Sequence, residues 1–288
     1  QADVVCVNSC AITARGERDA RNAVFRLRRA APAARLILTG CAARLFEDFR
    51  RHGHEDCVQP DLVLPQGDKR LLLAGPWTED AQAPAGEAQA PSYPPFAISG
   101  FRRARPVLKV QDGCDYCCSY CTIPFARGHS RSGEVADLVR RAEQVAAHGG
   151  REIVLTGVNV GDFGRDTGSS FLRLLEALDE VEGIDRFRIS SIEPNLITDE
   201  IIDFVRGSKR FAPHFHIPLQ SGSDKVLRLM RRRYRREVFA HKVELIHELM
   251  PDAYIGVDVI VGMRGEEEAD FEESAAFIAG LPVSKLHV

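Results

Sequence analysis

Half of the eight cysteines lie within one short loop, and no other stretch constrains the fold as strongly. The loop belongs to residues 107–131, VLKVQDGCDYCCSYCTIPFARGHSR, and follows a Val/Leu-rich run that predicts a β-strand. Thiols this close along a chain are typical of a metal centre. The loop is therefore the candidate metal site, and its cysteines are Cys114, Cys117, Cys118 and Cys121.

Two spacings within the loop indicate two kinds of metal centre. Cys114-x3-Cys118-x2-Cys121 supplies three thiolates, which would leave one iron of a four-iron cluster open for a ligand. Cys114-x2-Cys117 together with Cys118-x2-Cys121 supplies four thiolates, which could close around zinc. The residues alone leave an iron–sulfur cluster and a structural zinc site as alternatives.

Composition narrows the class of protein. Among 288 residues, 44% hydrophobic, no apolar run is long enough to predict a membrane span. The first residues, QADVVCVNSC, lack the pattern of a signal peptide, and eight cysteines are too sparse for a disulfide scaffold. We therefore expect a cytoplasmic protein with free or metal-bound thiols.

Basic residues cluster although the formal net charge is −3. The densest run is KVLRLMRRRYRR at 225–236, and others are Arg102, Arg103 and Arg105 and the segment from Arg15 to Arg29. Such a run is most often a solvated helix face, and phosphate binding is the alternative.

The first part of the chain predicts a small α/β unit. Strands are expected at 3–8, 35–39 and 61–64, a helix at 17–31 and a helical turn at 69–74. Cys10 and Cys41 follow the first two strands, and the carboxyl ends of parallel strands share an edge where ligands bind. The two cysteines are therefore candidate partners in one site, or else ordinary small buried residues.

The stretch 74–100 is rich in Pro, Ala and Gly and predicts a linker. Strand and helix patterns then alternate, which is typical of a parallel barrel or partial barrel with its ligand-binding face at the carboxyl ends of the strands. Strands are predicted at 107–111, 152–156, 187–192, 214–217, 255–261 and 284–288. Helices are predicted at 133–148, 170–181, 198–206, 223–231, 235–249 and 268–280.

The CxxxCxxC spacing, with Tyr120 before the last cysteine, resembles the signature of radical S-adenosylmethionine enzymes. The resemblance implies that Cys114, Cys118 and Cys121 bind a [4Fe–4S] cluster and that Cys117 is not a ligand.

More narrowly, the chain is similar to the methylthiotransferases, because VVCVNSCAIT and LILTGCAAR match segments that carry cysteines of an auxiliary [4Fe–4S] cluster. This implies Cys10 and Cys41 as two of its ligands, with a third expected upstream of Gln1. The small RNA-binding barrel usual at the carboxyl end of the family is expected to be absent.

The resulting fold prediction is α/β, a partial (β/α)6 radical-SAM barrel with a smaller N-terminal methylthiotransferase domain truncated at its start. The predicted parts are 1–74 for that domain, 75–100 for the linker and 101–288 for the barrel.

The segments KVQDGCxxxCSYCxIPFARGHSRS, LTGVNVGDFG and HIPLQSGSDKVLRLMRRRY most resemble the branch that modifies N6-threonylcarbamoyladenosine next to the tRNA anticodon. Relatives acting on N6-isopentenyladenosine in tRNA or on a ribosomal protein aspartate are the alternatives, and a non-catalytic zinc-binding RNA module is the alternative from another class. Met263-Arg264 and Ser132-Gly133 depart from the usual Phe-Pro and Ser-Arg.

By this resemblance, S-adenosylmethionine supplies a radical that removes hydrogen from C2 of the adenine, and a sulfur carried at the auxiliary cluster, methylated by another S-adenosylmethionine, is added there. No catalytic residue is expected beyond the clusters. The implied partners are the tRNA anticodon stem-loop and an electron donor, and a monomer is expected. Predicted cofactor-binding residues are Tyr120, Gly157, Asn159, Ser191, Glu193, Gln220, Val261 and Gly262. Predicted RNA-binding residues are Arg231, Arg232, Arg233, Arg235 and Arg236.

Overall fold

The computed structural model describes residues 2–10, 13–43, 59–65, 69, 71–72 and 105–288. The predicted linker at 75–100 and half of the helical turn at 69–74 lie outside the described residues. Two compact units are present. The first combines the described N-terminal residues with 113–115 and 121–129, and the second contains the remainder from position 105.

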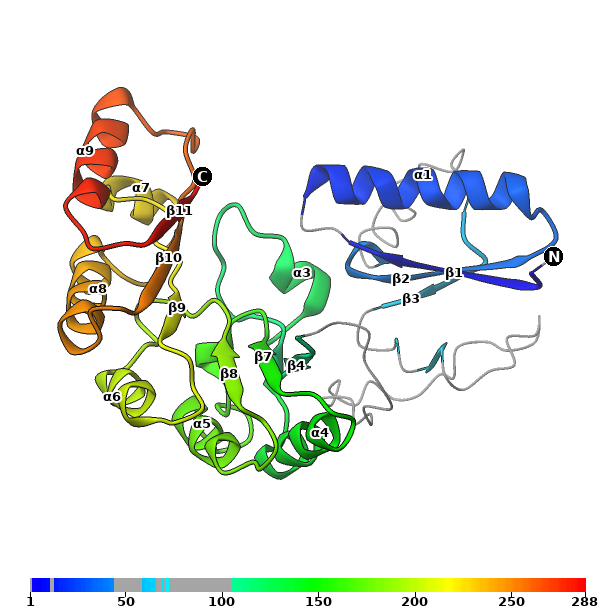
Figure 1. Ribbon diagram of the computed structural model, residues 1–288. Helices are drawn as coiled ribbons and strands as arrows, with labels where there is room; N and C mark the ends of the chain where they lie inside the picture. The colour runs from blue at the N-terminus through cyan, green and yellow to red at the C-terminus, as the bar shows by residue number, and fades with distance from the viewer. Residues whose placement is uncertain (1, 11–12, 44–58, 66–68, 70, 73–104) are drawn as a thin grey trace. The chain divides into compact units, whose positions relative to one another are not determined.

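The first unit is a three-stranded parallel sheet with one long helix (Figure 1). Its elements are β1 (Val4–Ser9), α1 (Ala14–Ala30), β2 (Arg35–Gly40) and β3 (Leu62–Leu64), and the strand order is β1-β2-β3. Helix α1 begins after Thr13, whose hydroxyl accepts a hydrogen bond from the Gly16 backbone N–H at 3.0 Å. Val24 of α1 packs with Val7, Leu36 and Leu38 of the sheet and forms the small core.

Asp61 joins the helix to the sheet of this unit. Its carboxylate accepts hydrogen bonds from Arg28 Nη2 and from the Leu36 backbone N–H, each at 2.6 Å. Burial alone would raise the pKa of Asp61, but these hydrogen bonds and the Arg28 charge outweigh it, and the net direction is downward.

The second unit contains six parallel strands in two sheets, and they follow one another in an arc (Figure 1). One sheet has the order β4-β7-β8 and the other β11-β10-β9. Bridge pairing of Ser191 with His216 and a hydrogen bond of 3.0 Å from Ile192 N to His216 O connect the two. The strands are β4 (Val107–Lys109), β7 (Glu152–Thr156), β8 (Arg186–Ile189), β9 (His214–His216), β10 (Tyr254–Asp258) and β11 (Lys285–His287).

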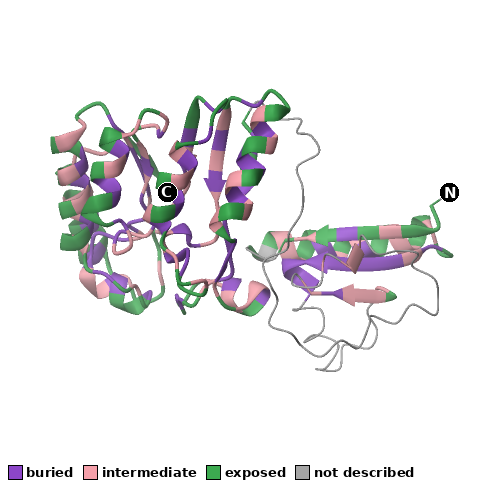
Figure 2. Cartoon of the chain, turned by 90° about the horizontal axis from the view of Figure 1, so that it is seen from below, coloured by how far each residue is buried: buried purple, intermediate pink, exposed green. Residues whose placement is uncertain are grey.

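Amphipathic helices cover the outer face of the arc, and buried residues lie between the two layers (Figure 2). In the first of them Leu138, Ala142 and Val145 are fully buried at helical spacing. Phe187, Phe215 and other large apolar side chains fill the core from the strands. The helices are α4 (Val135–Ala147), α5 (Phe171–Asp179), α6 (Asp199–Gly207), α7 (Asp224–Leu229), α8 (Arg236–Leu249) and α9 (Glu268–Ala279).

The α/β fold prediction therefore agrees with the structure, including all six strands and six helices expected in the second unit. Three predicted strands extended two or three residues too far: β4 ends at Lys109 and not 111, β8 ends at Ile189 and not 192, and β10 ends at Asp258 and not 261. After β8 the polar residues Ser190 and Ser191 belong to the following loop, whereas after β10 the apolar residues 259–261 lie outside the strand. Within the described residues, no helix is long and apolar enough to cross a membrane.

Candidate functional site

A short antiparallel pair of strands closes the cysteine loop at its base. Strand β5 (Gln111–Asp112) pairs with β6 (Arg131–Ser132), so residues 113–130 form the loop between them. Gly113 has φ +72°, and a Cβ there would collide with the His129 carbonyl, so the close crossing of the two loop arms requires glycine. The Cys114 N–H donates to the Gly128 carbonyl at 3.0 Å. Neither β5–β6 nor helix α3 (Ile123–Arg127) was predicted.

Buried polar contacts fix the base of the loop. Asp112 is almost fully buried and accepts hydrogen bonds from Lys109 Nζ at 2.6 Å and Arg131 Nη2 at 2.9 Å. A buried carboxylate is stable only when it is paired in this way, so these contacts hold β5 and β6 in place.

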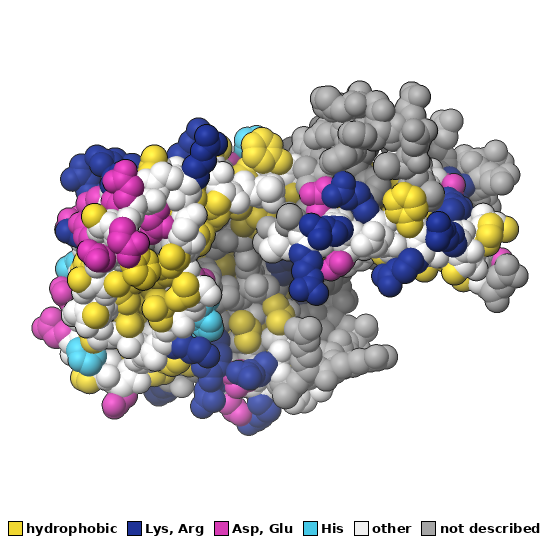
Figure 3. Space-filling model, turned by 90° about the horizontal axis from the view of Figure 1, so that it is seen from above, with side chains coloured by type: hydrophobic (Ala, Val, Ile, Leu, Met, Phe, Trp, Pro, Cys, Tyr) yellow, Lys and Arg dark blue, Asp and Glu magenta, His cyan; other side chains and the backbone are white. Residues whose placement is uncertain are grey.

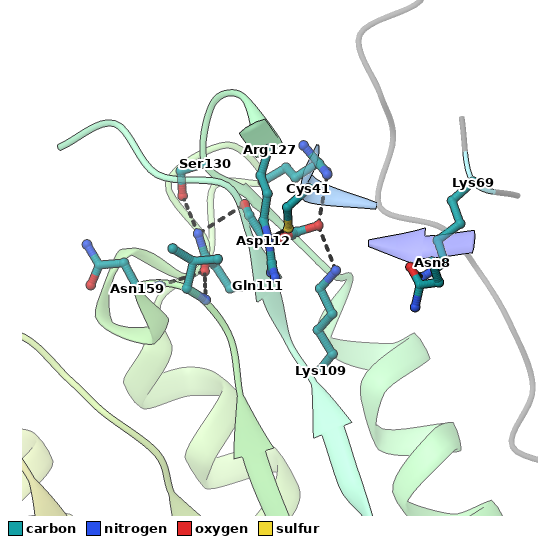
Figure 4. Close-up of polar contacts among 11 residues, drawn as sticks. Asn8, Cys41, Lys69, Lys109, Gln111, Asp112, Arg127, Ser130 and Asn159 are labelled. Atoms are coloured by element: carbon teal, nitrogen blue, oxygen red, sulfur yellow. Dashed lines mark hydrogen bonds and ion pairs between the residues drawn. The ribbon is translucent and has the colours of Figure 1, made fainter. Parts of the chain in front are cut away.

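Gln111 connects the cysteine loop to the loop after β7 (Figure 4). Its Nε2 donates to Ser130 Oγ at 2.8 Å, and its Oε1 accepts hydrogen bonds from the N–H groups of Val158 and Asn159, both at 2.9 Å. No sequence signal marks this role, because its partners lie 19 to 48 residues away.

The loop cysteines differ in exposure, and none of them is in a disulfide. Cys118 is buried, Cys114 and Cys121 are half-buried, and Cys117 is exposed. No group of three His, Cys, Asp or Glu side chains in the described part of the chain could hold a single metal ion. A [4Fe–4S] cluster does not need such a group, because each of its cysteines binds a different iron.

Arg232 is the centre of a buried polar cluster next to Cys118. Its Nη1 donates to Cys118 Sγ at 3.1 Å and to the Tyr120 hydroxyl at 3.2 Å, and its Nε donates to the Tyr234 hydroxyl at 3.1 Å. Its Nη2 forms an ion pair with Glu193. Burial lowers the pKa of Arg232, but its interactions with Tyr234 and Glu193 outweigh it, and the net direction is upward. Arg232 is thus a permanent cation.

This cluster bears on two expectations from the sequence. The Arg232 side chain is only 3% exposed, so it does not belong with the arginines available to phosphate. Glu193 binds Arg232 through Oε2, and its contact with a ribose hydroxyl stays a prediction. Burial raises the pKa of Glu193, and Arg232 opposes this rise.

Asn159 offers a buried amide to a ligand. It directly precedes the short helical turn η2 (Val160–Asp162), is 4% exposed, and neither its Oδ1 nor its Nδ2 has a hydrogen-bond partner among the described residues. A buried amide without partners is costly. The site therefore suits a polar ligand group, and the contact of Asn159 with S-adenosylmethionine stays a prediction.

The other predicted cofactor residues lie in loops after the strands. Ser191 Oγ is 3.1 Å from His216 Nδ1, and Gln220 has φ 69° and pairs in a bridge with Val259. The Gly157 Cα faces Gln111, since a Cβ there would lie 3.0 Å from Gln111 Oε1. Val261 and Gly262 are exposed.

The remaining arginines of the basic run differ in their contacts. Arg231, Arg233 and Arg235 are exposed, and the Arg233 guanidinium lies 4.1 Å from the Tyr116 ring centroid. Arg236 is half-buried and donates to Glu273 at 2.6 Å. The exposed members of the run are thus the ones that remain candidates for phosphate contact.

Cys10 and Cys41 follow strands that pair in parallel, with Ser9 opposite Gly40 in the register. Cys41 is 4% exposed, whereas Cys10 is exposed. Within the same unit, Arg127 Nε donates to Cys41 Sγ at 3.2 Å (Figure 4). The two thiols therefore follow neighbouring strands at one edge, as the sequence predicted, and Cys41 has a cationic hydrogen-bond donor.

Comparison with known families agrees with this arrangement. Residues 108–278 match the Radical SAM superfamily, and residues 1–58 match Uncharacterized protein family UPF0004. The chain is 36% identical over its full length to Threonylcarbamoyladenosine tRNA methylthiotransferase MtaB of Aquifex aeolicus, covering 70% of it. It is 37% identical to the protein of the same name from Bacillus subtilis, again over its full length, but covers 64% of that relative.

A further relative, tRNA-2-methylthio-N(6)-dimethylallyladenosine synthase of Parafrankia sp., is 36% identical over 95% of the chain and 56% of the relative. Two solved structures share the fold at low identity. The radical S-adenosylmethionine methyltransferase TsrM of Kitasatospora setae gives a TM-score of 0.68 at 16% identity, over 96% of this chain and 60% of that one. The cobalamin-dependent S-adenosylmethionine radical enzyme OxsB gives a TM-score of 0.59 at 12% identity, over 96% of this chain and 43% of that one.

The fold and the cysteine loop thus define a radical S-adenosylmethionine protein, and the partial-barrel prediction is confirmed. The chain belongs to the Radical SAM superfamily and, within it, to the methylthiotransferase family. Membership implies a [4Fe–4S] cluster and S-adenosylmethionine. The three thiols with CxxxCxxC spacing and the buried amide of Asn159 fit that pair of groups.

Proposed function

We propose that this chain carries the catalytic part of a methylthiotransferase that converts N6-threonylcarbamoyladenosine, next to the tRNA anticodon, to its 2-methylthio derivative. The observation that carries the proposal is the CxxxCxxC triad of thiols in the loop between β5 and β6, none of them in a disulfide, in a chain that matches over its full length relatives with that activity in their names. The chain spans 64 to 70% of those relatives, so the activity of the whole protein is part of the proposal.

In this proposal Cys114, Cys118 and Cys121 hold the cluster, which together with S-adenosylmethionine supplies radical chemistry for an unactivated C–H bond. Asn159 binds the polar amino-acid end of the cofactor with its amide. Arg232 fixes Cys118 and Tyr120 through its hydrogen bonds and keeps a positive charge beside the sulfur. Gln111 sets the position of Asn159 through its backbone.

Cys10 and Cys41 are proposed ligands of an auxiliary [4Fe–4S] cluster. Their adjacent strand ends and the Arg127 hydrogen bond to Cys41 support this role, because a cation beside a thiol favours the thiolate that binds metal. By the resemblance, this cluster carries the sulfur that is transferred to the substrate. The proposed partners of the protein are the tRNA anticodon stem-loop and an electron donor.

The test is product analysis after anaerobic reconstitution. Three substrates are compared: tRNA with N6-threonylcarbamoyladenosine, tRNA with N6-isopentenyladenosine, and the ribosomal protein. Mass spectrometry should find the methylthio group on the first substrate only. Product on the second alone would favour the activity in the name of the Parafrankia relative. No product on any substrate, from protein with a full cluster, would remove the proposal.

A further inference from the structure

Helix α1 has one face in the core and one face open to solvent. Ala20 and Val24 are buried on the inner face. On the outer face, exposed residues recur at intervals of three or four, which places them in one row along the helix. Figure 3 shows basic side chains gathered along this part of the first unit. The row consists of Arg15, Arg18, Asn22, Phe25, Arg26 and Arg29.

The arginines of α1 fall into two groups by their contacts. Arg21 pairs with Glu17 at 3.2 Å, and Arg28 binds Asp61 and the Ala34 carbonyl, so these two serve the fold. Arg18, Arg26 and Arg29 show no hydrogen bond or ion pair within the described ranges. Among the described residues, none pairs with these three charges.

The outer row has nearly one sign of charge. Asp19 is the acidic residue beside it, and its contact with Arg15 is long, at 4.0 Å, between side chains that are 90% and 68% exposed. Such an exposed pair contributes little. Surfaces that serve only solubility usually mix the two signs, whereas a row of one sign attracts a polyanion.

The spacing of the row suits a phosphate backbone. Arginines three or four residues apart on a helix are separated by about 4.5 to 6 Å along the axis, and Arg15 to Arg29 spans about 21 Å. Phe25 is 36% exposed in the middle of the row. An exposed aromatic ring among arginines is the combination with which proteins stack bases and contact phosphates of unpaired RNA.

We propose that the outer face of α1 binds RNA, with Arg18, Arg26 and Arg29 on phosphates and Phe25 stacked on an unpaired base. The identity of this RNA as the tRNA substrate rests on the proposed function. An acidic protein partner would also meet the arginines, but it gives no role to the exposed ring at the centre of the row, and RNA is therefore favoured.

The test removes the three charges together, in Arg18→Gln/Arg26→Gln/Arg29→Gln, and measures tRNA affinity over a range of salt concentrations. The full chain with reconstituted clusters and a tRNA that carries N6-threonylcarbamoyladenosine are used. The slope of log K against log salt should become shallower by about two to three, since each phosphate contact contributes about 0.7 to 0.9. Affinity at low salt should fall at least tenfold.

The matched control removes three exposed charges from the other unit, in Arg173→Gln/Arg206→Gln/Lys209→Gln, and should keep the wild-type slope. Phe25→Ala should weaken binding with an unchanged slope, because stacking involves no counterion release. Circular dichroism and the thermal midpoint establish that each variant is folded.

Two outcomes overturn the proposal: wild-type affinity and slope in the α1 variant, or equal losses in the α1 and control variants. The first is also the result expected if the row binds an acidic protein. Wild-type protein that forms no methylthio product but binds tRNA through α1 would remove the proposed function and keep the RNA surface. Product formation together with tRNA binding that is independent of α1 would support the proposed function and remove the RNA surface.

Discussion

Arg232 and Cys118 are 114 residues apart in the sequence, yet the Arg232 guanidinium donates a hydrogen bond to the Cys118 sulfur at 3.1 Å. The same guanidinium is paired with Glu193 and bound to two tyrosine hydroxyls. A cation fixed in this way can stabilise negative charge on the sulfur of a cluster ligand. Its own burial is tolerated because Glu193 supplies the opposite charge within the core.

Breaking this pair on one side should destabilise the second unit. Arg232→Gln leaves Glu193 buried without a partner, at a cost of about 3 to 5 kcal/mol in the free energy of unfolding. Glu193→Gln should cost a similar amount, because it strands the arginine. The double variant should be more stable than the sum of the two losses predicts, and urea unfolding measures all three. Strictly additive losses would show that the two side chains do not interact.

Arg232→Lys should lower the reduction potential of the cluster on the loop. The substitution keeps a charge but loses the planar fork of donors, so the hydrogen bond to Cys118 Sγ is lost and the more negative, reduced cluster is less stabilised. Potentiometric titration followed by electron paramagnetic resonance measures the change. Arg236→Lys is the control, since the Arg236 side chain contacts Glu273, Glu237, the Gly222 carbonyl and the Phe277 ring and does not contact the loop cysteines. An equal potential in wild type and Arg232→Lys would contradict this role.

Asn159→Leu should weaken S-adenosylmethionine binding while the protein stays folded. The Asn159 amide has no hydrogen-bond partner among the described residues, so its removal takes no hydrogen bond from the fold. A polar group of the ligand, in contrast, would lose its hydrogen bond to this amide. A hydrogen bond to a charged group is worth about 1.5 to 3 kcal/mol, or roughly 10- to 150-fold in Kd. Calorimetry on reconstituted protein measures Kd, and thermal unfolding measures stability. Unchanged Kd with a lowered midpoint would assign Asn159 to the fold alone.

Asp61 should give the first unit a stability that depends on pH. Because its pKa is lowered in the folded state, the stabilisation is present above the unfolded pKa of about 3.9 and is lost as pH falls through the folded value. Asp61→Asn should destabilise the unit at pH 7 and reduce the further loss in acid. Thermal midpoints measured from pH 7 to pH 3 test this. Parallel curves for wild type and variant would contradict it.

The sequence was sufficient for the elements with strong periodicity. The apolar spacing in 133–148 and the β-branched runs at 3–8 and 152–156 predicted α4, β1 and β7 to within a few residues, because each buries one face in a single core. Strands β5 and β6 have two residues each and helix α3 has five, too short for any period to be visible.

The polar network was not predictable for a different reason. Arg232 lies in a basic run that resembles a solvated face, but α7 ends at Leu229 and Arg231 has φ 57°. The Arg232 N–H bonds back to the Leu227 carbonyl, as at a helix C-terminus, and this turn directs Arg232 inward. Its partners Glu193 and Cys118 are distant in sequence, and local patterns carry no information about them.

The central claim is that three of the four loop cysteines bind a [4Fe–4S] cluster and that Cys117 does not. Its most direct test is the iron and sulfide content after anaerobic reconstitution, in a chain with Cys10 and Cys41 replaced by serine. About four iron and four sulfide are expected per chain, unchanged in Cys117→Ser and lost in Cys118→Ser. Equal loss in both variants, or one zinc per chain in place of iron, would contradict the claim.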